Sequence, residues 1–214
     1  MLGSVVNCPK GLPAGSETAI LSIFGYDPLR FFTGRSPMEA AASGIHLHPG
    51  DVAYRMNLIA LEDGEKPYEE KKILSHSAGS IDGADAYEAV DTLEHDARFA
   101  ALLKEARMTI HRFPAFRQIP VQSGADITGL VTIPPHDHLG EPLGPLQPTG
   151  CENAKLLARM MKTAHEILDH APVNERRRAA GKLPANGIWF WAEGTAVELP
   201  EFRKMFGHWG CVIS

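Results

Sequence analysis

The sequence has no apolar run that approaches the roughly 20 residues a helix needs to cross a bilayer, so we expect no membrane span. It has no basic excess either: the formal net charge is −5, which argues against a dedicated nucleic-acid surface. The opening residues lack the charged, apolar and cleavage regions of a secretory signal. Cysteine is scarce, and Cys8, Cys151 and Cys211 lie far apart, which is typical of free thiols in a reducing cytoplasm. We therefore expect a cytoplasmic protein with neither nucleic-acid nor membrane partners.

What the sequence does contain is an ordinary globular composition, 44% hydrophobic and 22% charged, in a chain long enough to bury a core. Strand-like and helix-like segments alternate without an internal repeat, so we predict an α/β fold, a mixed sheet with helices packed on it. The predicted strands cover residues 53–61, 68–74, 108–113, 127–133 and 188–191, and the predicted helices cover 82–107 with a break near residues 95–96, 153–170, 173–180 and 199–206.

The stretch from Gly11 to Asn57 carries the first chemical signals. A turn of small residues places Ser16 at the start of an apolar segment that we expect to be helical. Backbone N–H groups and the helix dipole at such a helix N-terminus favour an anion. The alternative is that Ser16 only caps its helix. Further on, Ser36 fits an N-cap with Glu39 as its capping-box partner.

The strand that follows Gly50 places Arg55 and Asn57 on one face and Tyr54 and Met56 on the other. Arginines on well-fixed elements, here Arg35 and Arg55, can grip phosphate or carboxylate through two parallel hydrogen bonds. The alternative is that these arginines are solvated or paired with acids, and for a single arginine this is the commoner outcome.

A proline-rich loop over residues 134–150 opens with His136 and Asp137 after two prolines. Loops of this length in compact domains are usually functional or disordered. A zinc site built from the pairs His46/His48 and His136/His138 is an alternative hypothesis. Nothing in the sequence brings the two pairs together, so isolated surface histidines are the preferred interpretation.

Several motifs occur in the order found in one enzyme family: GSETAILSIFGYDP, TGRSPMEAAASGI, PGDVAYRMN, then Phe116-Arg117, PPHD and PVNERRRAAGKLPANGIWFW. The chain resembles the archaeal-type cofactor-independent (2,3-bisphosphoglycerate-independent) phosphoglycerate mutases of the alkaline phosphatase superfamily. The resemblance implies a central section of such an enzyme. Residues 1–30 and 207–214 would belong to the parent catalytic domain and residues 31–206 to an inserted substrate domain. The junctions at Arg30 and Gly207 should then lie close in space.

The resemblance also implies roles for particular residues. Ser16 would be the nucleophile that takes the phosphoryl group while 3- and 2-phosphoglycerate interconvert. In the intact enzyme a divalent metal (Mn, Mg or Zn) would activate it, through ligands outside this chain, so we expect no metal site here and no turnover by this section alone. The implied substrate-binding residues are Arg35, Arg55, Asn57, Arg117, His136, Asp137, Asn174, Arg177 and Lys182.

Some positions depart from the family pattern. Glu17 stands where aspartate is usual, and Ser80 and Gln118 stand where histidine is usual. Ala192-Glu193 replaces a more common Gly-Gln pair. Two alternatives to the mutase hypothesis therefore remain: a stand-alone binding module for small phosphorylated or phosphonate acids, and a metal hydrolase built on the histidine pairs.

Overall fold

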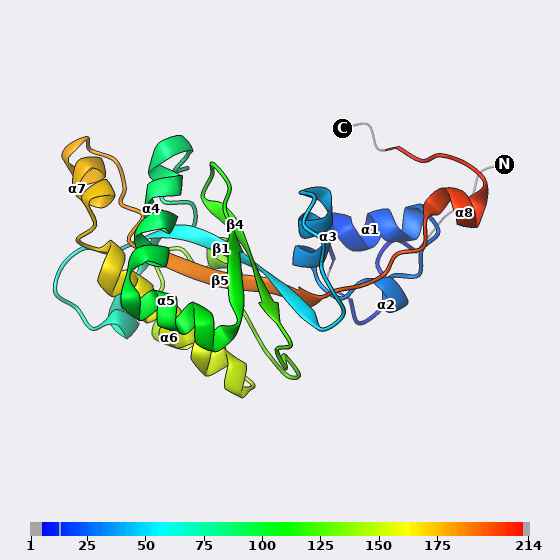
Figure 1. The fold of residues 1–214 in the computed structure, drawn as a ribbon, viewed down its shortest axis with the longest axis horizontal. Helices are drawn as coiled ribbons and strands as arrows, with labels where there is room; N and C mark the ends of the chain where they lie inside the picture. The colour runs from blue at the N-terminus through cyan, green and yellow to red at the C-terminus, as the bar shows by residue number, and fades with distance from the viewer. Residues whose placement is uncertain (1–5, 13, 212–214) are drawn as a thin grey trace.

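The computed structural model describes residues 6–12 and 14–211, and a five-stranded sheet forms its centre (Figure 1). The long strand β1 (Asp51–Leu61) lies between β4 (Arg117–Ser123) and β5 (Gly187–Thr195). β3 (Met108–His111) adds to β4, and β2 (Ile73–Ser75) pairs with the end of β1. Each of these pairings is antiparallel. The helices are α1 (Ser16–Ile23), α2 (Pro28–Phe31), α3 (Arg35–Ala42), α4 (Gly83–His95), α5 (Ala97–Ala106), α6 (Glu152–Leu168), α7 (Pro172–Ala179) and α8 (Phe202–Phe206), with short 3-10 helices η1 (Tyr68–Glu70), η2 (Pro135–Asp137) and η3 (Gly144–Leu146).

One face of the sheet carries the main hydrophobic core. Tyr54, Met56 and Leu58 of β1 are fully buried there, together with apolar residues of α4, α5 and α6. Helix α6 has the stripe expected for this role, with Leu157 and Met161 both inaccessible to solvent. The predicted α/β class, a sheet with helices packed on it, is confirmed.

The opposite face of β1 holds Ala53, Arg55 and Asn57. Ala53 packs with Ala40 of α3 and Ile119 of β4 in a second, small apolar cluster. All eleven residues of β1 are buried because both faces of the strand are covered. The predicted separation of Arg55 and Asn57 from the core face is therefore confirmed, although neither face is open to bulk solvent.

Helices α1, α2 and α8 form a group at one end of the long β1–β5 ribbon (Figure 1). Tyr26, between α1 and α2, links this early part of the chain to the segment around α8. Its ring centroid lies 6.3 Å from those of Phe202 and Phe206, and its hydroxyl donates to the carbonyl of Pro200 at 2.7 Å. The segments that flank the expected junctions therefore contact each other. The domain boundaries at residues 30/31 and 206/207 stay predictions.

The strand predicted over residues 127–133 is wrong, because that segment is irregular apart from a bridge between Val131 and Thr149. The strand that the sequence analysis did not predict is β4, which contains Pro120. Proline lacks the N–H that a central strand needs, so its presence argues against a strand in the sequence. β4 keeps one constant register along β1, but the ladder pairs stop at Ala53–Val121 and resume at Met56–Gln118, so Pro120 falls in a gap of the β1–β4 pairing.

The predicted capping box at the start of α3 is also wrong. The N-cap is Gly34, and α3 begins one residue before Ser36. The Ser36 hydroxyl instead donates to the carbonyl of Ala192 at 2.5 Å, and Glu39 bonds to arginines. The predicted break in the long helical segment is confirmed: Asp96 is extended and caps α5 by accepting from the Arg98 N–H at 2.8 Å.

Candidate functional site

Three neighbouring strands bring polar side chains to the sheet face opposite the core. In the β-ladder Arg55 lies directly opposite Trp191 of β5, and Asn57 lies opposite Arg117 of β4. The Arg55 guanidinium lies 4.7 Å from the centroid of the Trp191 ring, and the indole N–H donates to Asn57 Oδ1 at 3.1 Å. We call these four residues the polar face. Their order follows from strand alternation and register alone.

Helix α3 places Glu39 on this face. Arg55 donates to Glu39 through Nε at 2.8 Å and through Nη2, while Arg35 donates to the same carboxylate at 3.1 Å. Burial opposes ionisation of Glu39, but the hydrogen bonds and charge of Arg55, helped by Arg117 and Arg35, outweigh it and hold the pKa below its ordinary value. Arg55 is only 2% exposed, so its charge is largely neutralised inside the protein.

Arg117 is the contrasting arginine of the polar face. It has no ion pair with any residue in the ranges 6–12 and 14–211, and its buried Nε has no hydrogen-bond partner there. Its guanidinium lies 5.2 Å from the centroid of the Phe116 ring. Burial and the charges of Arg55 and Arg35 lower its pKa, against the opposing effect of Glu39. An arginine without a carboxylate among like charges is poised to take an external anion.

Two histidines lie against the polar face. His136 of η2 contacts the Trp191 ring, with the centroids 5.2 Å apart. His76, in the loop after β2, lies 5.9 Å from both His136 and Phe116, and Asn57 holds that loop by donating to the His76 carbonyl at 2.8 Å. Burial, His136 and Arg117 lower the pKa of His76. Sequence reasoning missed His76, because a histidine in a loop carries no signal of its neighbours.

Ser16 lies at the edge of the same network. It is the first residue of α1 and is exposed, with Gly15 as the N-cap, so the alternative of a capping serine is wrong. Its hydroxyl donates to Glu17 Oε2 at 3.3 Å, and that oxygen lies 3.8 Å from Arg35 Nη1. Contacts therefore run from Ser16 through Glu17 and Arg35 to Glu39 and the polar face. Asp137 stands beside His136 at 3.7 Å and is largely exposed.

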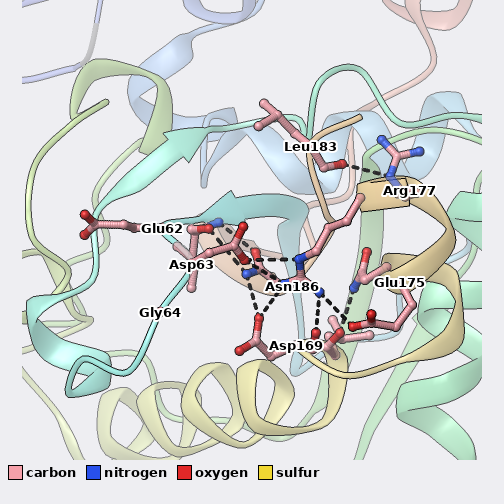
Figure 2. A network of polar contacts seen from close by, with 12 residues as sticks. Glu62, Asp63, Gly64, Asp169, Glu175, Arg177, Leu183 and Asn186 are labelled. Atoms are coloured by element: carbon pink, nitrogen blue, oxygen red, sulfur yellow. Dashed lines mark hydrogen bonds and ion pairs between the residues drawn. The ribbon is translucent and has the colours of Figure 1, made fainter. Parts of the chain in front are cut away.

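Asn174 and Arg177 have internal partners instead. The Asn174 side chain is fully buried and bonds to backbone groups of Leu168 and Ala185. Arg177 is 5% exposed and donates to the carbonyls of Leu183 and Ala78 and to Asp85 at 2.8 Å (Figure 2 shows the Leu183 contact). These contacts tie α7 to its surroundings. Lys182 is exposed on the turn after α7, where its N–H donates to the Arg177 carbonyl at 2.9 Å.

Two of the unusual positions also have structural partners. Gln118 is fully buried and bonds to Phe113 and Ala115, so it fixes the turn before β4. Glu193 accepts from the Thr132 hydroxyl at 2.5 Å. Gln118 and Glu193 are therefore not assigned to ligand binding on the polar face.

The residues that the structure describes include no group of three or more His, Cys, Asp or Glu side chains able to hold a metal ion. His46 and His48 contact each other, with ring centroids 5.2 Å apart, while His138 bonds to Glu141 at 3.0 Å. The zinc hypothesis for the histidine pairs is therefore not supported, and these residues do not fit the metal implied by the resemblance. In the described part of the chain no helix is long and apolar enough to cross a membrane.

The model of the family described as 2,3-bisphosphoglycerate-independent phosphoglycerate mutase matches residues 1–174. The chain belongs to this family. Two similar proteins with that name come from Methanothermobacter thermautotrophicus, 34% identical over 99% of this chain and 49% of the relative, and from Methanothrix thermoacetophila, 38% identical over 96% and 48%. The chain thus spans about half the length of the curated relatives it matches.

Two solved structures agree with the fold. The cofactor-independent phosphoglycerate mutase from Thermoplasma acidophilum superposes with a TM-score of 0.60 at 24% identity, over 90% of this chain and 49% of that one. The PH0037 protein from Pyrococcus horikoshii also gives 0.60, at 26% identity, over 92% and 42%. The family model and the curated relatives confirm the family resemblance read from the sequence motifs, and the two solved structures agree in fold.

Proposed function

We propose that this chain forms the substrate-binding part of a phosphoglycerate mutase that interconverts 3- and 2-phosphoglycerate. The observation that carries the proposal is the state of Arg117, a half-buried guanidinium on the polar face whose Nε lacks a partner among the described residues. The substrate carries a phosphate and a carboxylate on three carbons. Arg117 supplies one cation for it, and the neighbouring His136 and Arg35 supply further donors.

The remaining polar residues position these donors. Glu39 holds Arg55 against Trp191, and Asn57 fixes both the Trp191 indole and the His76 loop. Asp137, whose carboxylate lies 3.7 Å from the His136 imidazole and is largely exposed, orients His136. Asn174 and Arg177 support α7 and are not assigned to the ligand, and Lys182 is not assigned to it either.

Ser16 is the proposed phosphoryl acceptor. Its oxygen would form the new P–O bond while the bond from phosphorus to the substrate oxygen breaks, and the group would return to the neighbouring hydroxyl of the same acid. A bare serine is a poor nucleophile at neutral pH, and a divalent metal would supply the activation when bound. Its ligands would belong to residues of the relatives that this chain does not span. We assign residues 1–30 and 207–214 to that catalytic part, residues 31–206 to the inserted domain, and the protein to the cytoplasm.

Isothermal titration calorimetry with 3-phosphoglycerate tests the proposal. We expect the wild-type chain to bind and Arg117→Ala to bind at least tenfold more weakly, since a charge-assisted bond contributes about 1.5–3 kcal/mol. Arg159→Ala is the matched control, because Arg159 is an exposed arginine paired with Glu105. Absence of binding by the wild-type chain would refute the proposal. A mutase assay with added manganese should give no turnover, and turnover at ordinary enzyme rates would refute the assignment of the metal ligands elsewhere.

A further inference from the structure

The loop between β2 and α4 contains a left-handed turn. Ala78, Gly79 and Ser80 have φ values of +48°, +67° and +57° in succession. A residue other than glycine adopts this conformation as an isolated case and is disfavoured there roughly tenfold, because its Cβ meets the following carbonyl oxygen. A run of three such residues, two of which are not glycine, therefore persists only where the surrounding structure imposes it.

Hydrogen bonds within the loop account for part of this turn. Ser75 Oγ accepts from the N–H groups of Ser77 at 3.3 Å and Gly79 at 3.0 Å, and Ser77 Oγ accepts from the Ser80 N–H at 3.2 Å. None of these bonds uses the carbonyl of Ala78, a residue that is fully buried. Because a buried carbonyl without a partner is costly, Ala78 needs a donor from elsewhere in the fold.

Arg177 of α7 supplies that donor. Its Nη2 donates to the Ala78 carbonyl at 2.9 Å, its Nη1 donates to Asp85 of α4 at 2.8 Å, and its Nε donates to the Leu183 carbonyl at 2.9 Å. Each nitrogen of the guanidinium thus has a partner inside the protein, and no partner belongs to the polar face. The side chain is only 5% exposed. Arg177 therefore holds the turn and does not face a ligand.

The turn begins two residues after His76, which lies against the polar face. The His76 ring centroid is 5.9 Å from those of His136 and Phe116, and the Arg117 guanidinium lies over the Phe116 ring. Asn57 donates to the His76 carbonyl at 2.8 Å, so β1 holds one side of His76 and the turn holds the other. If the turn relaxed, His76 would move and the surroundings of His136 and Arg117 would change.

We propose that Arg177 is a positioning residue of the proposed substrate site: it imposes the left-handed turn over residues 78–80 and thereby fixes His76 beside His136. Arg177 acts from a separate helix, through the turn, without touching the ligand. This inference rests on the proposed function and adds to it a residue outside the polar face. The strain explains why a specific donor is needed, since a relaxed loop would keep its conformation without Arg177.

The test compares Arg177→Lys with Arg176→Lys, a control on the exposed neighbour that pairs with Glu88. Lysine keeps the positive charge but lacks the planar fork that reaches three separate partners. Calorimetry with 3-phosphoglycerate should show about tenfold weaker binding for Arg177→Lys, because the loss of a charge-assisted hydrogen bond releases the turn. Arg176→Lys should bind as the wild type does.

A second readout follows His76 directly, by NMR titration of the unliganded protein. In the wild type, burial and the charges of His136 and Arg117 keep the pKa of His76 below its ordinary 6.5. In Arg177→Lys the ring is free to move into solvent, so this pKa should rise toward 6.5. Ser75→Ala removes the acceptor of two N–H groups of the turn and should raise it in the same direction, with Arg177 intact.

A rescue variant tests the role of strain. Glycine adopts positive φ without a Cβ clash, so Ser80→Gly added to Arg177→Lys should recover at least about twofold of the lost affinity and return the His76 pKa toward the wild-type value. Ser80 is exposed, so this change removes no buried group. Absence of any rescue would overturn the inference, because strain would then not be what Arg177 opposes.

A folded Arg177→Lys variant with wild-type affinity and wild-type His76 pKa would also overturn the inference. Weaker binding with an unchanged His76 pKa would do the same, because Arg177 would then contact the ligand itself. If Arg177→Lys does not fold, Ser75→Ala decides, and a wild-type His76 pKa in that variant would contradict the proposal. Absence of 3-phosphoglycerate binding by the wild type would refute the proposed function, while the pKa readout would still decide whether Arg177 fixes His76.

Discussion

Gly34 and Gly194 lie backbone against backbone, where the entrance of α3 crosses β5. A Cβ on Gly34 would stand 2.0 Å from the carbonyl oxygen of Glu193 and 2.7 Å from the Cα of Gly194. A Cβ on Gly194 would in turn meet Gly34 at 2.8 Å and the ring of Pro37. This close approach seats α3 on the sheet and thereby brings Glu39 within reach of Arg55.

Gly34→Ala should destabilise the protein severely. Gly34 has φ +146°, a conformation that side chains rarely adopt, and the new Cβ would collide with backbone that cannot rotate away. We expect a loss of more than about 3 kcal/mol in the free energy of unfolding, measured by urea denaturation. Gly44→Ala is the control: Gly44 also has positive φ (+75°), but open space surrounds its Cβ position, so the loss should be about 1 kcal/mol. Equal losses would contradict the proposed backbone contact.

The Glu39–Arg55 pair should make stability depend on acid pH. The pKa of Glu39 is lowered from 4.5 by folding, so its contribution is present above pH 4.5 and is lost as the pH falls through the lower folded value. Glu39→Gln leaves Arg55 buried without its carboxylate and should cost about 2–3 kcal/mol at pH 7.

The difference between wild type and Glu39→Gln should shrink as the pH falls below 4.5, as followed by urea unfolding at several pH values. Glu166→Gln, on an exposed residue 3.8 Å from Arg98, should differ from wild type by no more than about 0.5 kcal/mol throughout. A wild-type-to-Glu39→Gln difference that stays constant to low pH would show that the ionised pair contributes nothing specific.

Adjacent arginines on α7 should respond differently to truncation. Arg177 is buried with Asp85 and two carbonyls, so Arg177→Ala should cost about 3 kcal/mol. Arg176 is 55% exposed and paired with Glu88, so Arg176→Ala should cost less than about 1 kcal/mol. Thermal denaturation measures both. If Arg177→Ala kept its stability but lost affinity for 3-phosphoglycerate, Arg177 would be a ligand contact after all.

Local patterns were sufficient for several features of this chain. Alternation along β1 separates Arg55 and Asn57 from Tyr54 and Met56 because successive residues of a strand point to opposite faces. The helix break at Asp96 follows from its capping side chain. The motifs, which follow one another along the chain in the order found in the family, identified that family. Each of these depends on residues close in the sequence.

Other features depend on partners far along the chain. The sequence did not reveal the strand around Pro120, because the pairing of β4 with β1 on one side and β3 on the other exists only in the assembled sheet. Arg177 matched a family motif, yet the packing of α7 on α4 buries it.

The sequence by itself determined the fold class, the family and which residue types were available to bind an anion. Only the tertiary structure decided which arginine of the polar face lacks an ion pair, because a guanidinium is neutralised or left open by the carboxylates that fold against it. Glu39 reaches Arg55 from 16 positions away and leaves Arg117 without an ion pair among the described residues. His76 and His136, sixty positions apart, meet for the same reason: sheet register and loop packing set their distance, and no local pattern encodes it.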